Sequence, residues 1–439
     1  MPISFPVALF RFTVAAAVLL LCASFGIGQK YDSIEKGRMK DMLKVIKSDI
    51  KSHYFDPEYK GIDLEAKFQA AAEKLSGATS TGQALGIIAQ TVIDFNDSHL
   101  YFIPPATNLR VDYGWRMSYI GDKCIVTDVK PGSDAEKKGL KPGDEIIAIN
   151  GFRITRSELW KVQYYYNRIS KRGSLVLAVL SPGASSARDI EIASEVKHQP
   201  QTIVGDSLFR LNDDFYNEKN DDHRFVKLAG GITVWKMPSW AFDPSLSGNL
   251  FSRAANGQSI IMDLRCNGGG YVVNLEDIAG YFVDKDTQIA ELKGRKKMDP
   301  QVAKTKGSKV FPGKLVILLD SRSGSASEIF ARFMQLQKRA TVIGDVSAGA
   351  VMQSMTYDHD IGGGSYVLFA VSVTNADVIM SDGKSLEHVG VIPDELVLPT
   401  PADVAAGRDV VMERAVELLG GKVDPAEAGK WFPYFWKTK

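Results

Sequence analysis

The sequence is poor in cysteine and has no excess of either charge. Three cysteines in 439 residues exclude a small protein held together by disulfides. Lys and Arg total 53 and Asp and Glu total 52, so the formal charge of +1 gives no whole-chain field that would attract nucleic acid or an anionic membrane. We therefore expect neither nucleic acid nor, beyond a signal peptide, a membrane as a partner.

The chain also lacks the local spacings that bind metals. Neither a CxxC nor an HExxH pattern is present, and the six histidines are scattered. They are His53, His99, His198, His223, His359 and His388. We therefore expect no metal site and no cofactor.

One apolar run stands at the N-terminus. Arg11 is the only charge before Lys30, and the intervening residues are apolar and end in small side chains near Gly28. This pattern is typical of a secretory signal peptide and is short for a membrane span, although an uncleaved anchor is the alternative. Cys22 follows the bulky Leu21, which argues against a lipid attachment signal. We expect residues 1–28 to be removed and the protein to be exported, to a periplasm or outside the cell.

Cleavage would leave Cys124 and Cys266, which lie in different predicted domains. A single distant pair is weak support for a bridge even in an oxidising compartment. We expect two free or buried thiols.

The mature chain divides into several predicted parts. The 45% hydrophobic content is that of a packed globule, and the length suggests two to four domains. Apolar residues recur at three- and four-residue steps up to about Asp97, so residues 29–106 are predicted to form a helical domain that ends near Pro104 and Pro105. An aromatic tail, 425–439, must pack or mediate contacts.

Residues 107–196 are rich in strand and turn signals. The segments 123–129, 131–140 and 141–151 read as a strand, a turn with a short helix, and a further strand. Their order resembles a PDZ domain, which binds an extended peptide as an added strand. Tyr113, Gly114 and Trp115 are the candidate carboxylate-binding loop, and a mere spacer domain is the alternative.

Residues 197–424 alternate strands with helices, which predicts an α/β core with a largely parallel sheet. The expected strands are 232–237, 259–265, 314–320 and 340–344. We expect helices at 275–282, 327–337 and 404–419, and a charged surface insertion at 284–309.

Two turns in this core carry possible chemistry. The segment 263–270, Asp-Leu-Arg-Cys-Asn-Gly-Gly-Gly, follows a strand, and its glycines can direct backbone N–H groups into a cavity. The segment 320–330, with its small residues, can expose a hydroxyl beside a helix N-terminus, although alone such a turn is more often a helix cap.

Together, the two turns resemble those of the serine peptidases of the C-terminal processing and tricorn core family. The resemblance implies a crotonase-like α/β core, often with an inserted PDZ-like β-domain, which here would follow the N-terminal helical domain. It places the nucleophile on Ser325. It also implies an oxyanion hole formed by the N–H of Ala326 and of a residue within Gly268, Gly269 and Gly270.

The general base distinguishes two branches of that family. The C-terminal processing branch uses a lysine, and Ala350 stands here where that lysine would be. The tricorn-like branch uses a histidine preceded by a serine and assisted by a distant glutamate, and Ser98, His99 and Glu387 match those positions. The resemblance implies that His99 is the base, oriented by Ser98 and Glu387.

Other candidates stay open at this stage. His388 is a second possible base, and Ser323 and Ser327 are further possible nucleophiles. The resemblance implies an exported serine endopeptidase whose PDZ domain presents a polypeptide substrate. The missing lysine motivates an alternative, a catalytically inactive homologue that acts as a PDZ peptide-binding protein.

Overall fold

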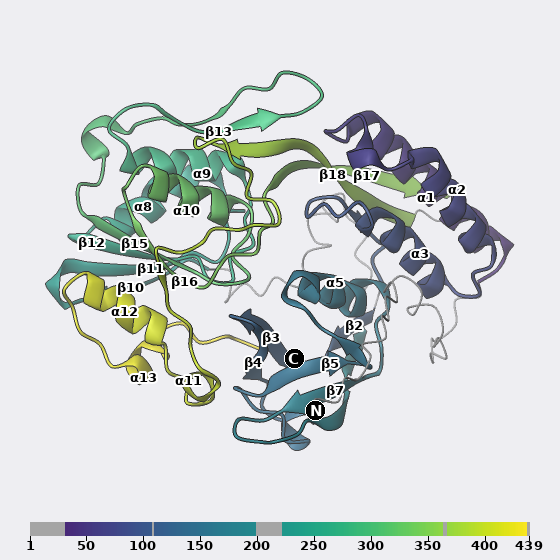
Figure 1. The fold of residues 1–439 in the computed structure, drawn as a ribbon, viewed down its shortest axis with the longest axis horizontal. Coiled ribbons are helices and arrows are strands. Elements are labelled where there is room, and N and C mark those ends of the chain that lie inside the picture. Colours follow the sequence, from purple (N-terminus) through teal and green to yellow (C-terminus); the bar gives the residue numbers. More distant parts are fainter. Residues whose placement is uncertain (1–30, 108, 199–221, 363–366, 437–439) are drawn as a thin grey trace, which may run out of the picture.

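The structure, a computed structural model, describes residues 31–107, 109–198, 222–362 and 367–436 (Figure 1). The expected signal peptide, 1–28, lies outside the described residues, as does part of the 197–424 range. Among the described helices, none combines the length and apolar character that a membrane span requires.

Three helices form the N-terminal part: α1 (Ser33–His53), α2 (Leu64–Ser76) and α3 (Thr81–Ile93). Each begins at a side-chain cap, since the oxygens of Asp32, Asp63 and Ser80 accept backbone N–H groups of the first turn. Their apolar faces pack on one another and on strand β18 (Val367–Met380). The expected helical N-terminal region is confirmed.

The core is a six-stranded sheet in the order β10-β11-β12-β15-β16-β19. All neighbours are parallel except the antiparallel β10 and β11. The strands are β10 (Arg224–Leu228), β11 (Ile232–Lys236), β12 (Ser259–Asp263), β15 (Lys314–Leu319), β16 (Thr341–Gly344) and β19 (Glu395–Leu396). The expected α/β core and its four predicted strands are confirmed.

Helices cover both faces of this sheet (Figure 1). The first face carries α8 (Ser247–Ala254), α9 (Val272–Ala279) and α10 (Ala326–Leu336). The second carries α12 (Val410–Leu418) and α13 (Pro425–Ala428). The predicted helix 404–419 is wrong as a single element, because the chain turns through Gly407 (φ +62°) between α11 (Pro401–Ala405) and α12.

A second sheet links the core to the N-terminal helices. The hairpin of β17 (Met352–Ile361) and β18 extends from the core to α1, and β18 also pairs with β1 (Tyr101–Ile103) and β13 (Thr287–Lys293). The predicted surface insertion at 284–309 is therefore partly wrong, since β13 and β14 (Gln301–Ala303) join this sheet and bury Ile289. Through β1, the turn at 96–100 is held against the core.

Residues 109–198 form a separate β-rich unit. Its sheet runs β3-β4-β5-β7-β8, with β6 on β5, while β2 pairs with β9. The elements are β2 (Leu109–Asp112), β3 (Trp115–Ile120), β4 (Lys123–Val129), α4 (Asp134–Lys137), β5 (Glu145–Ile149), β6 (Phe152–Arg153), α5 (Leu159–Tyr164), β7 (Ser174–Leu180), β8 (Arg188–Ala193) and β9 (Glu195–His198).

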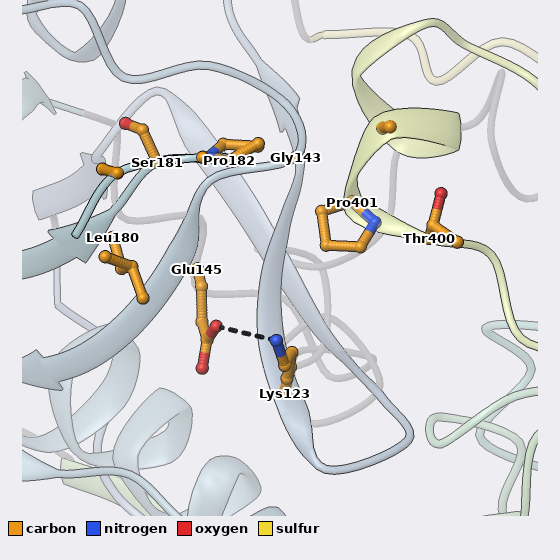
Figure 2. A pocket seen from close by; sticks show the side chains of 11 residues that line it. Lys123, Gly143, Glu145, Leu180, Ser181, Pro182, Thr400 and Pro401 are labelled. Carbon is orange, nitrogen blue, oxygen red and sulfur yellow. Dashed lines mark ion pairs between the residues drawn. The ribbon is translucent and has the colours of Figure 1, made fainter.

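This unit contacts the core through the edge strand β3. The hydroxyl of Ser321, in the turn after β15, donates to the Tyr119 carbonyl at 2.6 Å. Asp345 accepts from the Gly121 N–H and from Arg156, both at 2.9 Å. A pocket lies at the same junction, between the Lys123–Glu145 ion pair and Pro401 (Figure 2). The edge of β3 thus lies beside the turn that leads to Ser325.

The aromatic tail packs across the same junction. Arg224 of β10 donates to the Pro433 carbonyl at 3.1 Å, and the Tyr434 ring lies 3.9 Å from the guanidinium of Arg116 on β3. The tail therefore contacts both the core and the β-rich unit, in keeping with the expectation that it must pack.

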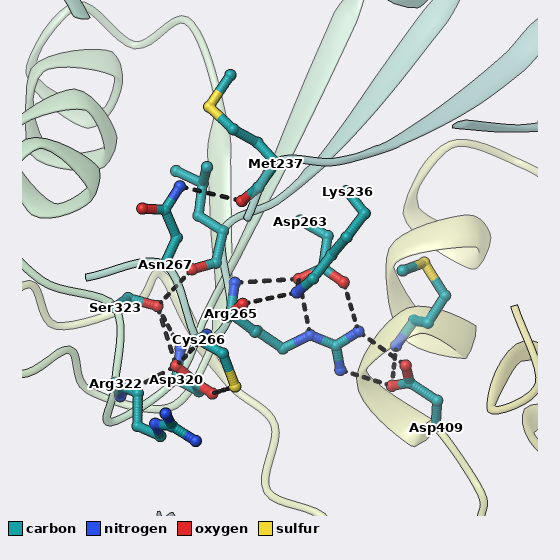
Figure 3. A network of polar contacts seen from close by, with 12 residues as sticks. Lys236, Met237, Asp263, Arg265, Cys266, Asn267, Asp320, Arg322, Ser323 and Asp409 are labelled. Carbon is teal, nitrogen blue, oxygen red and sulfur yellow. Dashed lines mark hydrogen bonds and ion pairs between the residues drawn. The ribbon is translucent and has the colours of Figure 1, made fainter. Parts of the chain in front are cut away.

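A buried ion-pair network fixes the C-terminal end of β12 (Figure 3). Asp263 is 1% exposed and pairs with Lys236 and Arg265, and Arg265 reaches on to Asp409, the residue that caps α12. The positive charges of Arg265 and Lys236 hold the pKa of Asp263 below its usual range, against the opposing effect of burial. The network joins the turn after β12 to the helical layer behind it.

Removing Arg265 should therefore destabilise the fold strongly. Arg265→Met leaves the Asp263 charge buried with one partner, so the free energy of unfolding should fall by about 3–5 kcal/mol in chemical denaturation near neutral pH. The difference should shrink below about pH 4, because the lowered pKa of Asp263 stabilises the wild-type fold only above the pKa of the unfolded chain. Arg414→Met, which breaks an exposed pair with Glu395, is the control and should change little. Equal effects of the two substitutions would contradict this account.

Candidate active site

Ser325 lies at a sharp turn between β15 and α10. Its backbone has φ +52° and ψ −119°, a conformation that residues other than glycine rarely adopt. Its N–H points to the carboxylate of Glu328 and the carbonyl of Ala350, both at 2.9 Å. This turn presents the Ser325 hydroxyl outward at the N-terminus of a helix, the geometry of an exposed nucleophile.

His99 reaches Ser325 from the turn between α3 and β1. Its Nε2 lies 3.2 Å from the Ser325 hydroxyl oxygen, and its Nδ1 lies 2.8 Å from the hydroxyl oxygen of Ser98. Ser98 in turn donates to Glu387 at 2.7 Å, and its N–H donates to the other oxygen of that carboxylate at 2.9 Å. The structure thus brings together the four side chains that the sequence analysis singled out.

The direction of these bonds settles the tautomer of His99. A carboxylate only accepts, so the single proton of the Ser98 hydroxyl goes to Glu387. The Ser98 oxygen then accepts from His99 Nδ1–H, and Nε2, without a proton, faces Ser325. Burial lowers the pKa of His99, while the charges of Glu387 and Asp97 oppose that effect. The imidazole is therefore neutral near pH 7, the form that can accept a proton.

The glycine turn after β12 comes close to Ser325 and Ala326. A Cβ on Gly269, where φ is +106°, would lie 2.6 Å from the Ser325 Cβ, so only glycine permits this approach. The Gly269 N–H donates to the Asn267 side chain at 2.9 Å. Among the described residues, the N–H groups of Gly268, Gly270 and Ala326 have no such partner. These three N–H groups are therefore the candidates for an oxyanion hole.

Asp320 joins the two turns (Figure 3). One of its oxygens accepts from the N–H groups of Cys266 and Arg322 at 2.9 and 3.0 Å, and the Gly324 N–H donates to the Asn267 carbonyl at 2.9 Å. These bonds set the position of the glycine turn relative to Ser325. Cys124 and Cys266 are both free, as expected.

The other candidate serines are occupied elsewhere. Ser323 and Ser327 are both fully buried. The Ser323 hydroxyl donates to the Leu264 carbonyl at 2.9 Å, and that of Ser327 donates to the Asn267 carbonyl at 3.0 Å. Neither hydroxyl faces His99. Both instead tie the two turns together.

His388 does not approach Ser325. Its ring is about half exposed, and Nε2 lies 2.9 Å from the Asn96 carbonyl. Ala350 lies beside the nucleophile, but through its backbone: its carbonyl accepts from the Ser325 N–H and its own N–H donates to Glu328 at 3.0 Å. Ala350, which stands where the C-terminal processing branch would have its lysine, thus contributes only a methyl side chain, and its backbone is held by hydrogen bonds.

Two carboxylates matter here that the sequence analysis did not single out. Asp97 is buried and accepts from the His99 N–H at 3.0 Å, the Tyr54 hydroxyl at 2.9 Å and the Thr374 hydroxyl at 2.6 Å, so it holds the turn that carries His99. Glu328 is fully buried beneath Ser325. Each stands within three residues of a predicted catalytic side chain, and this proximity is the only feature of the sequence that could have indicated it. Apart from the N–H groups of His99 and Ser325, their partners are remote in sequence.

The candidate peptide-binding loop lies at the start of β3. The Gly114 N–H donates to Asp112 at 2.9 Å, and the Tyr113 hydroxyl accepts the Arg172 N–H at 3.1 Å. The indole N–H of Trp115 is buried with no partner among the described residues. Tyr113 thus packs within the β-rich unit, while Trp115 begins β3, the outermost strand of its sheet. Metal-ligand groupings of three or more side chains are absent from the described residues.

Comparisons with known proteins agree with this layout. Residues 236–397 match the model of peptidase family S41, and residues 110–170 match the PDZ domain. A carboxyl-terminal-processing protease of Synechocystis is 25% identical over 69% of this chain and 66% of its own length. The carboxy-terminal processing protease CtpB of Bacillus subtilis is 26% identical over 84% of this chain and 74% of its own.

Solved structures share the fold. Mature CPAF superposes with a TM-score of 0.62 at 14% identity, covering 85% of this chain and 96% of the other. The photosystem II D1 C-terminal processing protease gives a TM-score of 0.51 at 17% identity, covering 83% of this chain and 93% of the other. At these identities the likeness concerns the arrangement of the chain.

The protonation of His99 offers a direct test of the site geometry. In NMR titrations its imidazole should titrate below the ordinary value of 6.5. Glu387→Gln should lower the midpoint further, because it removes a negative charge that favours the imidazolium. Glu417→Gln, at an exposed carboxylate of α12, should leave the midpoint in place. A midpoint that rises in Glu387→Gln would contradict the arrangement.

Proposed function

We propose that this chain, a serine peptidase of family S41 with a PDZ domain, is an exported endopeptidase that cleaves polypeptides through an acyl-enzyme on Ser325. The observation that carries the proposal is the continuous chain of contacts from Ser325 through His99 and Ser98 to Glu387. A serine hydroxyl needs such a base to become a nucleophile near neutral pH.

The first chemical step forms the acyl-enzyme. As the Ser325 oxygen bonds to the scissile carbonyl carbon, its proton passes to His99 Nε2 and the carbonyl electrons move onto its oxygen. The N–H groups of Ala326, Gly268 and Gly270, together with the positive end of α10, would stabilise that oxyanion. The tetrahedral species then collapses, the C–N bond breaks, and His99 returns the proton to the leaving amine.

Hydrolysis of the acyl-enzyme reverses these roles. A water molecule gives its proton to His99 Nε2 and attacks the acyl carbon, and the Ser325 oxygen leaves with the proton from His99. Through both steps the imidazolium charge forms beside Ser98 and Glu387. Ser98 transmits the effect of the carboxylate to the ring through two short hydrogen bonds, 2.8 and 2.7 Å.

The PDZ domain would supply the substrate. An extended peptide adds to a strand edge by main-chain hydrogen bonds. The part of β3 next to the loop at Tyr113, Gly114 and Trp115 would be that edge, since the core contacts β3 at Tyr119. Because Ser321 contacts β3 and lies four residues before Ser325, a bound segment would enter close to the nucleophile. The relatives' names, carboxyl-terminal processing proteases, suggest that the segment is a substrate's C-terminal end.

Export rests on the N-terminal residues 1–28. Their apolar run after Arg11 supports a cleaved signal peptide, with delivery to a periplasm or beyond the cell.

The alternative is an inactive homologue that only binds peptides. Ala350 in place of a lysine is the observation that favours it. The position of His99 favours catalysis instead, because its imidazole can replace the missing lysine as the base and lies within hydrogen-bonding distance of Ser325. An inactive homologue would bind polypeptide without cleaving it.

Substitution of the nucleophile or the base should abolish cleavage. Ser325→Ala and His99→Ala should each lower kcat for an unfolded fluorescent polypeptide by at least about 1000-fold with the fold intact by circular dichroism. Ser252→Ala on α8 and His53→Ala on α1, both exposed, are the matched controls and should cleave normally. Retained activity in Ser325→Ala would refute the assignment, and retained activity in His99→Ala would return attention to His388.

The peptide-binding loop can be tested separately from the chemistry. A Cβ on Gly114 would lie 2.5 Å from the Ser133 Cβ, so Gly114→Ala must displace the loop. It should weaken binding of a peptide with a free carboxylate about tenfold by fluorescence anisotropy, but leave hydrolysis of a small ester unaffected. Gly132→Ala is the matched control, because Gly132 has a similar φ, +77°, with no atoms within 4 Å of the added Cβ. Equal binding by both variants would exclude this loop.

A further inference from the structure

A second carboxylate, beyond the one that orients His99, lies under the nucleophile. Glu328 occupies the first turn of α10 and is 0% exposed. Its Oε1 accepts from the Ser347 hydroxyl at 2.6 Å and the Gly349 N–H at 2.7 Å. Its Oε2 accepts from the N–H groups of Ser325 at 2.9 Å and Ala350 at 3.0 Å. Among the described residues, no cationic side chain pairs with it.

These four donors suit the ionised carboxylate best, because it accepts from all of them at once. A proton on Oε2 would point at one of the N–H groups that now donate to it. A proton on Oε1 would oppose the Gly349 N–H or would turn the Ser347 hydroxyl, which already accepts the Val391 N–H at 2.6 Å, from a donor into an acceptor. A buried donor left without a partner is costly. Protonation of Glu328 therefore either breaks a bond to Ser325, Gly349 or Ala350, or reverses the bond to Ser347 and leaves the Ser347 hydroxyl proton without this acceptor.

Burial makes that protonation accessible near neutrality. Loss of hydration raises the pKa of Glu328 to about 7, although the four donors lower it. The charged and titratable groups nearest to Glu328 and its four donors are bound to other partners. Asp345 pairs with Arg156, and Glu387 is bound by Ser98 and the Val351 N–H. His99 lies across Ser325 and contacts its hydroxyl.

The bonds of Glu328 reach both halves of the site. On one side the carboxylate holds the Ser325 N–H, and thereby the left-handed turn that presents the nucleophile. On the other it holds Gly349 and Ala350, and the next N–H, that of Val351, donates to Glu387 at 2.9 Å. A shift of this segment would disturb the base and the nucleophile together.

We propose that Glu328 is a positioning residue whose ionised carboxylate holds Ser325 and the segment 347–351 in the reactive arrangement, so that peptide cleavage requires Glu328 without a proton. The proposal rests on the proposed peptidase function for its kinetic consequence, but the titration of the carboxylate is independent of activity. Glu328 touches no reacting atom and acts only through the backbone of Ser325 and its neighbours.

Protonation of either of two groups could make the activity fall as the pH decreases, a part of the pH profile called the acidic limb. The two groups can be distinguished. His99 must be neutral to act as a base, and its pKa lies below 6.5. Glu328 must be ionised, and its pKa lies near 7. Activity should therefore fall, as the pH decreases, at the higher of the two values, before the imidazole measured by NMR takes up its proton.

The deciding experiment perturbs Glu328 through Ser347. Ser347→Ala removes one donor to the carboxylate and should raise its pKa, so the acidic limb of kcat should move about one unit to higher pH. The NMR midpoint of His99 should stay in place. Ser252→Ala is the control and should leave the limb unchanged. A limb that coincides with the His99 midpoint, and stays there in Ser347→Ala, would overturn the proposal.

A second measurement needs no turnover. In the Ser325→Ala protein, the backbone amide resonances of Gly349 and Ala350 should titrate together near pH 7, as expected of donors to Glu328. Adding Ser347→Ala should move that midpoint upward, and adding Glu328→Gln should remove it. Absence of this titration would refute the role of Glu328 even in an active enzyme. Its presence in a chain that cleaves nothing would instead reject the peptidase function and leave the ionisation of Glu328 established.

Discussion

The site depends on how two carboxylates, Glu387 and Glu328, satisfy their hydrogen-bonding capacity in a desolvated environment. Each accepts several N–H and O–H donors, and neither forms a close pair with a lysine or arginine among the described residues. Donors to both come from one short segment, 347–351. Because a buried carboxylate without donors is costly, this segment can hardly move without disturbing both ends of the site.

That constraint gives Ala350 a structural explanation. Where a related branch would place a lysine, the backbone of Ala350 bonds to Ser325 and Glu328. The base instead arrives from the turn after α3, which β1 holds against the hairpin strand β18. Asp97 fixes that turn through Tyr54 and Thr374, so docking of the N-terminal helices on the core and assembly of the site are the same event.

The main secondary-structure elements and the catalytic side chains could be predicted from the sequence. The contacts that hold them in place could not. The parallel core strands and the N-terminal helices follow from local periodicity, and the family resemblance indicated Ser325, His99, Ser98 and Glu387. The hairpin of β17 and β18 and the break before α12 were missed, because both depend on tertiary contacts. Glu328 was hidden for the same reason: which N–H groups point at it depends on the path of a backbone segment some twenty residues away.

The central claim is that His99 activates Ser325, and covalent labelling tests it most directly. Incubation with a fluorophosphonate probe, followed by peptide mass spectrometry, should find the phosphonyl group on Ser325, with labelling greatly slowed in His99→Ala and absent in Ser325→Ala. Labelling at the same rate in the wild-type and His99→Ala proteins, or an adduct on a serine other than Ser325, would contradict the account.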